Sequence, residues 1–311
     1  MSERVKVLDQ TVRDDYALYQ GDCVDVVRGL KDESIHISIF SPPFASLYVY
    51  SNSDRDMGNV RDGEEFARHF AFLVPELLRV TLPGRMVAIH CMNLPTSKAR
   101  DGYIGLRDFR GDIIRLFVQA GWIYHSEVVI WKDPVTAMQR TKALGLLHKQ
   151  IKKDSCMSRQ GIPDYLVVMR KPGENPERVT HTAEEFPVAK WQRWASPVWM
   201  DVNPSRTLQR LSAREEKDER HICPLQLDVI ERALELWSNP SDVVLSPFAG
   251  IGSEGYCALQ MGRRFVGIEL KRSYYEQARA NLAAAKSQGG LFESAAEDGA
   301  EMIEAEAEAM P

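Results

Sequence analysis

The feature that most constrains this chain is a glycine-containing loop between an apolar run and a helical pattern. Residues 246–253 read SPFAGIGS; they follow the apolar run 243–245 and precede a helix expected over 255–261. In α/β proteins this order lets a ligand approach the glycine backbone while amides at the helix start face it. Glu269 ends the next expected strand, where an acid commonly binds ribose hydroxyls. The combination predicts a nucleoside-type cofactor.

The loop departs from the known phosphate-binding patterns. It has no Gly-Lys-Ser/Thr sequence, so it is not a Walker A loop, and it lacks the third glycine of the dinucleotide pattern. A cofactor without a pyrophosphate fits better, and S-adenosylmethionine is the obvious candidate. The alternative is that the glycines only form a turn and that Glu269 is a solvated acid.

Expected strands and helices alternate through the chain. Helices are expected over 22–30, 64–80, 112–120, 225–237 and 273–285, and strands over 35–40, 85–90, 122–131, 165–170, 243–245 and 265–268. This alternation predicts an α/β protein with a mainly parallel sheet. Residues 171–205 are rich in proline and tryptophan, so we expect irregular structure there, with the tryptophans in a core or a subunit interface.

Charge is distributed unevenly along the chain. Residues 288–311 hold seven acids and no Lys or Arg, so without them the net charge changes from -5 to +2. This acidic tail is expected to be disordered. Residues 138–171 hold eight basic residues against two acids. By charge alone this segment is equally compatible with contacts to nucleic-acid phosphates and with a solvated loop. The candidate phosphate contacts are Lys149, Lys152, Lys153 and Arg159.

Several protein classes are excluded by what the chain lacks. It has no apolar run of about 18 residues, so no membrane span or membrane partner is expected. Its first residues have no apolar signal core, so we expect a cytoplasmic protein. The five cysteines include no CxxC pair, which argues against zinc or a disulfide framework, and no metal is expected.

A second motif follows the expected strand over 35–40. It reads Ser41-Pro42-Pro43-Phe44, in which two prolines restrict the backbone next to an aromatic ring. Alone it is equally compatible with a plain loop. Together with the glycine loop it resembles the amino-methyltransferases of DNA, which carry Ser or Asp, two prolines and an aromatic residue. The order of motifs, with the cofactor loop last, resembles the circularly permuted β class, and the resemblance extends over residues 19–275.

The resemblance implies a role for each matching residue. Ser41, Pro42, Pro43 and Phe44 would be catalytic. The implied cofactor-binding residues are Asp22, Cys23, His221, Pro224, Gln226, Ser246, Phe248, Ala249, Gly250, Gly252, Ser253 and Glu269. Two positions depart from the frequent pattern, because Ser246 and Ser41 both stand where Asp is common.

The chemistry of an exocyclic amino group explains these residue types. Its nitrogen is a poor nucleophile, and inside a duplex it is out of reach, so the base must be flipped out. The Ser41 side chain and the Pro42 carbonyl would accept the two amino protons and direct the lone pair at the methyl group. Phe44 would stack on the base for about 1–3 kcal/mol. Orientation then supplies much of the rate, and no covalent enzyme intermediate is needed.

These inferences predict a Rossmann-like methyltransferase fold dependent on S-adenosylmethionine, with an inserted target-recognition region. We expect a catalytic half over 1–132, target recognition over 133–215, a cofactor-binding half over 216–287 and the tail over 288–311. The expected partners are double-stranded DNA and a second copy of the chain. Either a cognate restriction enzyme exists or the enzyme is an orphan of a bacterium or a phage.

Some alternatives stay open. A motif that begins with Ser favours N4 of cytosine, whereas the stretch 41–59 resembles orphan methyltransferases that often modify N6 of adenine, and adenine is slightly ahead. An RNA or protein amino-methyltransferase is disfavoured by the motif order. A catalytically idle DNA-binding regulator is disfavoured because both motifs are intact. A nicotinamide oxidoreductase is disfavoured because no Ser/Tyr/Lys or His relay pattern accompanies the glycine loop.

Overall fold

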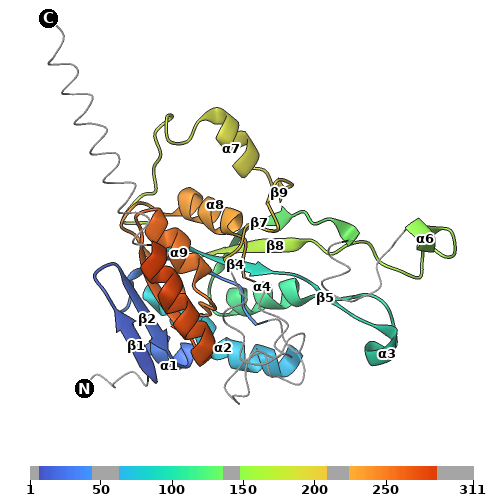
Figure 1. Ribbon diagram of the computed structural model, residues 1–311, viewed down its shortest axis with the longest axis horizontal. Coiled ribbons are helices and arrows are strands. Elements are labelled where there is room, and N and C mark those ends of the chain that lie inside the picture. The colour runs from blue at the N-terminus through green and yellow to red at the C-terminus, as the bar shows by residue number, and fades with distance from the viewer. Residues whose placement is uncertain (1–6, 44–62, 136–147, 209–223, 286–311) are drawn as a thin grey trace, which may run out of the picture.

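The centre of the molecule is a nine-stranded sheet. A computed structural model describes residues 7–43, 63–135, 148–208 and 224–285 (Figure 1). In sheet order the strands are β1 (Asp9–Val12), β2 (Tyr16–Gln20), β11 (Arg264–Glu269), β10 (Val243–Ser246), β3 (Ile35–Phe40), β4 (Thr81–Cys91), β8 (Asp164–Arg170), β7 (Ile123–Ile130) and β9 (Val198–Trp199). The five strands from β2 to β4 are parallel, whereas β1 and β8 run antiparallel to their neighbours.

Helices cover both faces of this sheet and give a three-layer α/β architecture (Figure 1). One face packs against α1 (Cys23–Arg28), α2 (Gly63–Val80) and α4 (Phe109–Gln119). The other packs against α8 (Leu227–Trp237), α9 (Ser253–Gln260) and a helix over 272–285. Apolar spacing explains the docking of α2, whose buried side is Phe66, Phe70, Leu73, Leu77 and Val80, as the sequence predicts.

Strand order brings together two segments that are about 200 residues apart in the chain. β10 and β3 are parallel neighbours, with Val244 opposite Ile37 and Leu245 opposite Ser38. The helix that follows β10 packs on one face, and the helix that follows β3 packs on the other. The junction of β10 and β3 is therefore the topological switch point, where open α/β sheets leave a crevice for ligands.

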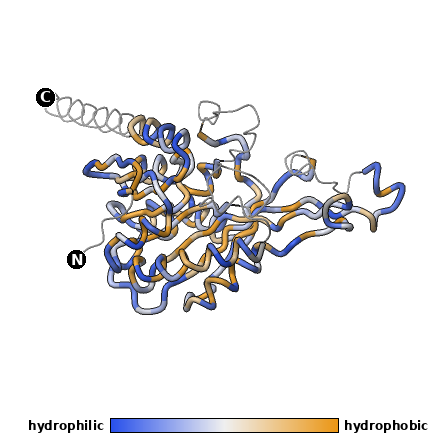
Figure 2. Tube along the Cα trace, turned by 90° about the horizontal axis from the view of Figure 1, so that it is seen from below, coloured by the Kyte–Doolittle hydropathy of each residue, from blue (hydrophilic) through white to orange (hydrophobic). Residues whose placement is uncertain are grey.

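Small elements extend from the β8 and β7 side of the sheet. The paired strands β5 (Leu94–Pro95) and β6 (Leu106–Arg107) flank α3 (Lys98–Asp101) in the chain. α6 (His148–Ile151) belongs to the segment that connects β7 to β8. Figure 2 shows this end of the molecule drawn out, with a hydrophilic tip. α7 (Val188–Trp194) lies above α8 in the view of Figure 1 and precedes β9 in the chain.

The sequence predicted the long elements and missed the short ones. The strand expected over 35–40 coincides with β3. β4 is longer than expected because it runs through Pro83 and Gly84 with a change of register, where Gly84 takes a φ of 71°. β1, β2, α7 and β9 were not expected, and β8 and β9, both within 133–215, belong to the central sheet. None of the helices in the described ranges has the length and hydropathy needed to cross a membrane.

Candidate active site

The predicted motifs meet at one edge of the sheet. The parallel strands β2, β11, β10, β3 and β4 all end there, so the loops after them share that edge. The cofactor loop follows β10, and Ser41 follows β3. Phe44 and His221 lie outside the described residues, so their expected roles stay predictions.

The glycine loop needs its glycines for two different reasons. Gly250 and Gly252 have φ values of 53° and 84°, a region that disfavours other residues. A Cβ on Gly252 would lie 3.2 Å from the Cβ of Ala278, so this glycine also lets the helix over 272–285 approach. A Cβ on Gly250 would meet nothing within 4 Å. The loop therefore borders open space at Gly250, as a ligand-binding loop requires.

Glu269 is held in place by the backbone around it. Its Oε2 accepts a hydrogen bond from the Gly250 amide at 2.8 Å, and its Oε1 accepts one from the Lys271 amide at 2.8 Å. The carbonyl of Glu269 accepts the Gly21 amide at 3.0 Å, which ties the end of β2 to the end of β11. This preset carboxylate lies where the sequence predicts contact with a ribose.

Asp22 and Cys23 lie beside this carboxylate. Asp22 caps α1, because its Oδ1 accepts the amides of Val24 at 2.9 Å and Asp25 at 3.1 Å. Burial raises the pKa of the Cys23 thiol, and the charges of Asp22 and Glu269 raise it further. The thiol is therefore protonated and inert, and the expected contact of these two residues with a cofactor stays a prediction.

Buried polar atoms without partners surround the glycine loop. Ser246 Oγ, Ser253 Oγ and the Oε1 of Gln226 are buried and make no hydrogen bond with any described residue. Gln226 precedes α8 without capping it through its side chain, and Pro224 is half-buried just before it. A buried polar atom without a partner costs free energy, so such a group of atoms favours a polar ligand at this place.

Phe248 of the cofactor loop connects this loop to the strand that precedes Ser41. The ring of Phe248 lies 5.7 Å from that of Phe40, which directly precedes Ser41. It also stacks on Phe70 of α2 at 6.2 Å. Ala249 is buried next to it, and its amide binds the Ile268 carbonyl at 2.8 Å. Phe248 and Ala249 thus fix the loop to the sheet.

A buried carboxyl group that the sequence did not single out lies at the start of α9. Glu254 is 4% exposed. Burial raises its pKa to about 8, and the charge of Glu269 contributes in the same direction. Glu254 therefore holds a proton at neutral pH in a place close to the cofactor loop.

Ser41 begins a chain of hydrogen bonds that crosses the sheet edge. Its Oγ lies 2.9 Å from Nδ1 of His90 on β4. The other ring nitrogen, Nε2, lies 2.8 Å from Oδ2 of Asp164 at the start of β8. Lys132, just after β7, forms an ion pair with the same carboxylate. Pro42 is buried and Pro43 is half-buried beside the serine.

Burial and charge act in opposite directions on Asp164, which is 1% exposed. Burial alone would raise its pKa, but His90 and Lys132 lower it to about 2. His90, Asp164 and Lys132 are functional candidates that the sequence reading missed. The available signal was a histidine and an aspartate at the ends of apolar strand runs, where a polar side chain needs a partner.

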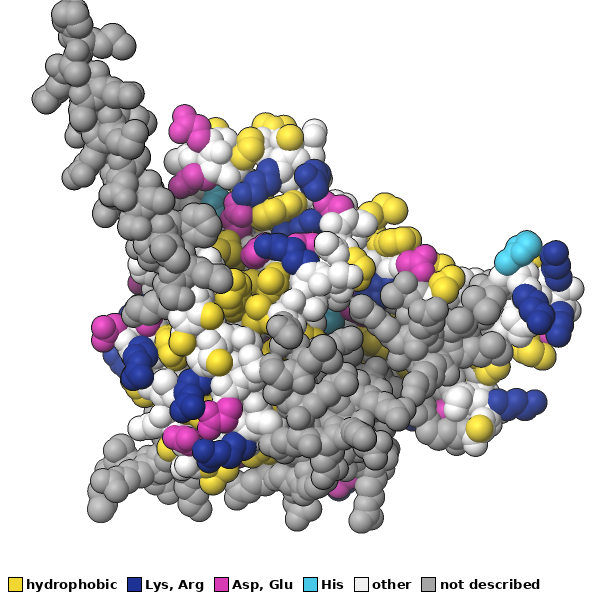
Figure 3. Space-filling model, in the orientation of Figure 1, with side chains coloured by type: hydrophobic (Ala, Val, Ile, Leu, Met, Phe, Trp, Pro, Cys, Tyr) yellow, Lys and Arg dark blue, Asp and Glu magenta, His cyan; other side chains and the backbone are white. Residues whose placement is uncertain are grey.

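The candidate DNA contacts lie away from the cofactor loop. Lys149, Lys152 and Lys153 are exposed on and after α6, and Figure 3 shows Lys and Arg side chains gathered on that tip. Arg159 differs, because it is partly buried, its Nη1 binds the Gln160 carbonyl at 2.9 Å, and burial lowers its pKa. Their contact with DNA stays a prediction.

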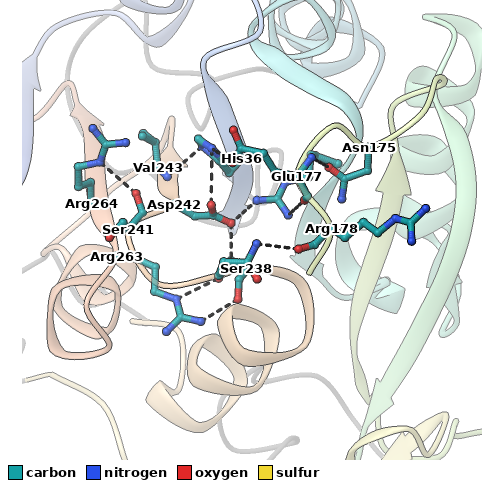
Figure 4. Close-up of polar contacts among 12 residues, drawn as sticks. His36, Asn175, Glu177, Arg178, Ser238, Ser241, Asp242, Val243, Arg263 and Arg264 are labelled. Carbon is teal, nitrogen blue, oxygen red and sulfur yellow. Dashed lines mark hydrogen bonds and ion pairs between the residues drawn. The ribbon is translucent and has the colours of Figure 1, made fainter. Parts of the chain in front are cut away.

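A second polar cluster lies at the opposite edge of the sheet, where β3 and β10 begin (Figure 4). Nε2 of His36 lies 3.3 Å from Glu177 and 3.5 Å from Asp242. Its Nδ1 accepts the Val243 amide at 3.1 Å, so the neutral ring carries its proton on Nε2 and offers no lone pair to a metal there. Asp242 also pairs with buried Arg85. The cluster is an ion-pair network that holds strand starts together.

Comparisons with known proteins agree with this geometry. The N6/N4 methyltransferase family model, described as DNA methylase, matches residues 35–280. The Type II methyltransferase M1.MboII of Moraxella bovis is 22% identical over 275 residues, which cover 84% of this chain and 94% of the relative. The Type II methyltransferase M.MjaI of Methanocaldococcus jannaschii is 22% identical over 272 residues, covering 78% and 84%.

Two solved structures share the fold. TTHA0409 from Thermus thermophilus, complexed with S-adenosyl-L-methionine, has a TM-score of 0.63 at 22% identity, covering 88% of this chain and 96% of that one. PvuII DNA methyltransferase, described as cytosine-N4-specific, has a TM-score of 0.64 at 13% identity, covering 91% and 96%.

Proposed function

This chain belongs to the DNA methylase family, and on that premise we propose that it transfers a methyl group from S-adenosylmethionine to the exocyclic amino group of a flipped base in double-stranded DNA. The observation that carries the proposal is the adjacency of β10 and β3. It puts the glycine loop and Ser41 at one switch point, although the two motifs are far apart in the chain.

The residues around the glycine loop fit the cofactor. Glu269 would bind the ribose hydroxyls, and Asp22 with Cys23 would lie by the adenine. Ser246, Ser253 and Gln226 offer buried polar atoms that have no partner among the described residues. His221, Pro224, Phe248, Ala249, Gly250 and Gly252 complete the proposed cofactor-binding set. When bound, S-adenosylmethionine supplies a methyl group already activated by a sulfonium.

Ser41 and Pro42 would act on the base. The serine hydroxyl and the proline carbonyl each accept one amino proton and hold the nitrogen with its lone pair directed at the methyl group. Pro43 restricts the backbone of the motif, and Phe44 stacks on the base. We place adenine ahead of cytosine, on the resemblance of residues 41–59 to orphan methyltransferases, although a motif that begins with Ser favours cytosine.

DNA would bind along the same sheet edge. The chain leaves the sheet after β7 and returns at β8, so the segment with α6 begins and ends beside Ser41. We propose that this segment, within the region 133–215, contacts DNA through Lys149, Lys152, Lys153 and Arg159. A second copy of the chain would pack on α7, where Val188 and Trp191 are 69% and 54% exposed.

The cellular setting follows from the same family. The two relatives named above are Type II methyltransferases, which supports a modification role beside a restriction enzyme, with an orphan role as the alternative. Four described cysteines are free thiols, in keeping with a reducing cytoplasm.

The test is methylation of duplex DNA with labelled S-adenosylmethionine, followed by mass spectrometry of the nucleosides. N6-methyladenine or N4-methylcytosine supports the proposal and identifies the base. Label in neither base, with the cofactor bound, refutes it. Ser41→Ala should lower single-turnover transfer and keep cofactor affinity. Ser34→Ala is the matched control, since that serine precedes β3 at the opposite edge and its hydroxyl donates to a local carbonyl, that of Lys31, at 2.6 Å.

A further inference from the structure

We infer that His90, held by Asp164 and Lys132, receives through Ser41 the proton that the amino nitrogen loses on methylation. This inference rests on the proposed function and adds to it a route for the proton. Nothing in the serine motif itself supplies such a route, because a serine hydroxyl is too weak a base to keep the proton.

The relay follows the order of the strands. Ser41, His90 and Asp164 belong to the neighbouring strands β3, β4 and β8 or to the loop next to them, and Lys132 follows β7 beside β8. Burial increases away from the serine, since His90 is 7% exposed and Asp164 is 1% exposed. Among these three hydrogen-bonded residues Ser41 is the most exposed, and it is where a base would bind.

The positions of the protons follow from the charge of Asp164. Its pKa of about 2 makes it a carboxylate at neutral pH, and a carboxylate only accepts hydrogen bonds. Nε2 of His90 must then donate its proton across the 2.8 Å contact. In a neutral imidazole this leaves Nδ1 as an acceptor, so the Ser41 hydroxyl donates to it across 2.9 Å. The lone pairs of the Ser41 oxygen stay available for an amino proton.

The transfer balances without any further reactant. The amino nitrogen forms a bond to the methyl carbon as the carbon–sulfur bond breaks, and the nitrogen then carries one proton too many. That proton passes to Ser41 Oγ while the hydroxyl proton passes to Nδ1 of His90. The products are a neutral methylated base, a neutral thioether and an imidazolium next to Asp164. The imidazolium returns its proton to solvent when the product leaves.

Lys132 supplies a counter-charge to the buried Asp164 carboxylate. The ion pair of Lys132 with Asp164 already balances the buried carboxylate. A buried charge without a partner is costly, and the ion pair with Lys132 reduces that cost for Asp164. Other titratable groups lie at this edge. Burial raises the pKa of Cys91 on β4 and of Tyr165 on β8, and the Arg110–Glu127 pair lies beyond them.

The main test is His90→Asn, which keeps an oxygen near the position of Nδ1 but takes up no proton. We expect single-turnover methyl transfer to fall roughly 100-fold, the lower range for a general base, with unchanged affinity for cofactor and DNA. His125→Asn is the matched control, because His125 also contacts a serine hydroxyl, Ser126 Oγ at 2.9 Å, but is exposed on β7. Equal transfer rates for His90→Asn and wild type overturn the relay.

The pH profile separates proton transfer from a structural role. In the wild type the rate should fall at acid pH with one protonation, because a charged His90 accepts nothing from Ser41. In His90→Asn this fall should disappear. If His90 has only a structural role, the pH profile of His90→Asn keeps the shape of the wild-type profile. The double variant Ser41→Ala/His90→Asn should lose little more methyl-transfer rate than Ser41→Ala alone, because both residues take part in the transfer of the same proton. Additive losses contradict the relay.

Nitrogen-15 NMR of the histidine rings tests the relay without any turnover. The folded protein at neutral pH should show His90 in the neutral form protonated on Nε2, and Ser41→Ala should move only its Nδ1 resonance. A ring protonated on Nδ1 refutes the relay even in an active enzyme. If wild type transfers no methyl group to DNA, the proposed function fails, while the tautomer still decides whether the hydrogen-bond chain exists.

Discussion

Replacing Glu254 by glutamine is expected to stabilise the folded protein by an amount that increases with pH. Glu254 is 4% exposed in the first turn of α9. Burial and the charge of Glu269 raise its pKa from 4.5 to about 8. Glutamine has the same size and carries no charge, so it removes the cost of ionisation and leaves the packing alone.

The sign follows from proton binding in the two states. Between pH 4.5 and about 8 the unfolded chain has released the proton of Glu254, whereas the folded protein still holds it. The folded state then binds more protons, so stability falls as pH rises through this range. Each pH unit is worth about 1.36 kcal/mol. At pH 7 the cost is (7 − 4.5) × 1.36, or about 3 kcal/mol, and it levels off near 5 kcal/mol above pH 8.

Urea unfolding at pH 5, 7 and 8 measures this difference. Glu254→Gln and wild type should have almost equal unfolding free energies at pH 5 and should diverge by about 3 kcal/mol at pH 7, with equal slopes against urea. Glu174→Gln, at an exposed position, is the control and should follow wild type at each pH. A difference between Glu254→Gln and wild type that does not change from pH 5 to pH 8 would refute the reasoning.

The remaining predictions concern the opposite sheet edge, the glycine loop and the basic segment. Asp242→Asn leaves Arg85 without its buried counter-charge and should lower the free energy of unfolding by about 3–5 kcal/mol in urea; a loss below 1 kcal/mol contradicts a stabilising pair. In Gly252→Ala the alanine must adopt a φ of 84°, which should lower the free energy of unfolding by about 1–2 kcal/mol and weaken cofactor binding in calorimetry; unchanged cofactor affinity would show that this loop does not bind the cofactor. Replacing Lys152 and Lys153 by Ala should weaken binding to all duplexes and reduce the salt slope by about 2 in fluorescence anisotropy; an unchanged slope shows that neither side chain touches phosphate.

Local patterns predicted the elements that form the frame of the site. β3 matches its expected range because an apolar run stops at two prolines. α2 buries the side that its spacing predicts. The cofactor loop was identified by its glycines between a strand and a helix, together with Glu269 after the next strand. In the structure the Gly250 amide of this loop donates to the Glu269 carboxylate. Each of these signals lies within a short stretch of chain, so a single sequence contains it.

What the sequence reading missed depends on contacts between distant segments. Asp164 and His90 are 74 residues apart and meet only because β8 lies antiparallel beside β4. No local pattern indicates that pairing, since β8 is reached after an excursion from β7. β1, at the edge of the sheet, and its neighbour β2 are short strands of 4 and 5 residues with weak patterns. The pKa of Glu254 likewise depends on burial, which its place after a glycine loop does not reveal.

The permuted order of the motifs is compatible with the site because the sheet edge, not the chain order, assembles it. Ser41 and the glycine loop need only follow parallel neighbours whose helices pack on opposite faces, as β3 and β10 do. The relay from Ser41 through His90 to Asp164 needs a further strand start at the same edge, and antiparallel β8 provides it. The antiparallel direction of β8 therefore has two consequences at once. It brings both ends of the segment between β7 and β8 to the edge of the sheet that carries the site, and it places Asp164 behind His90.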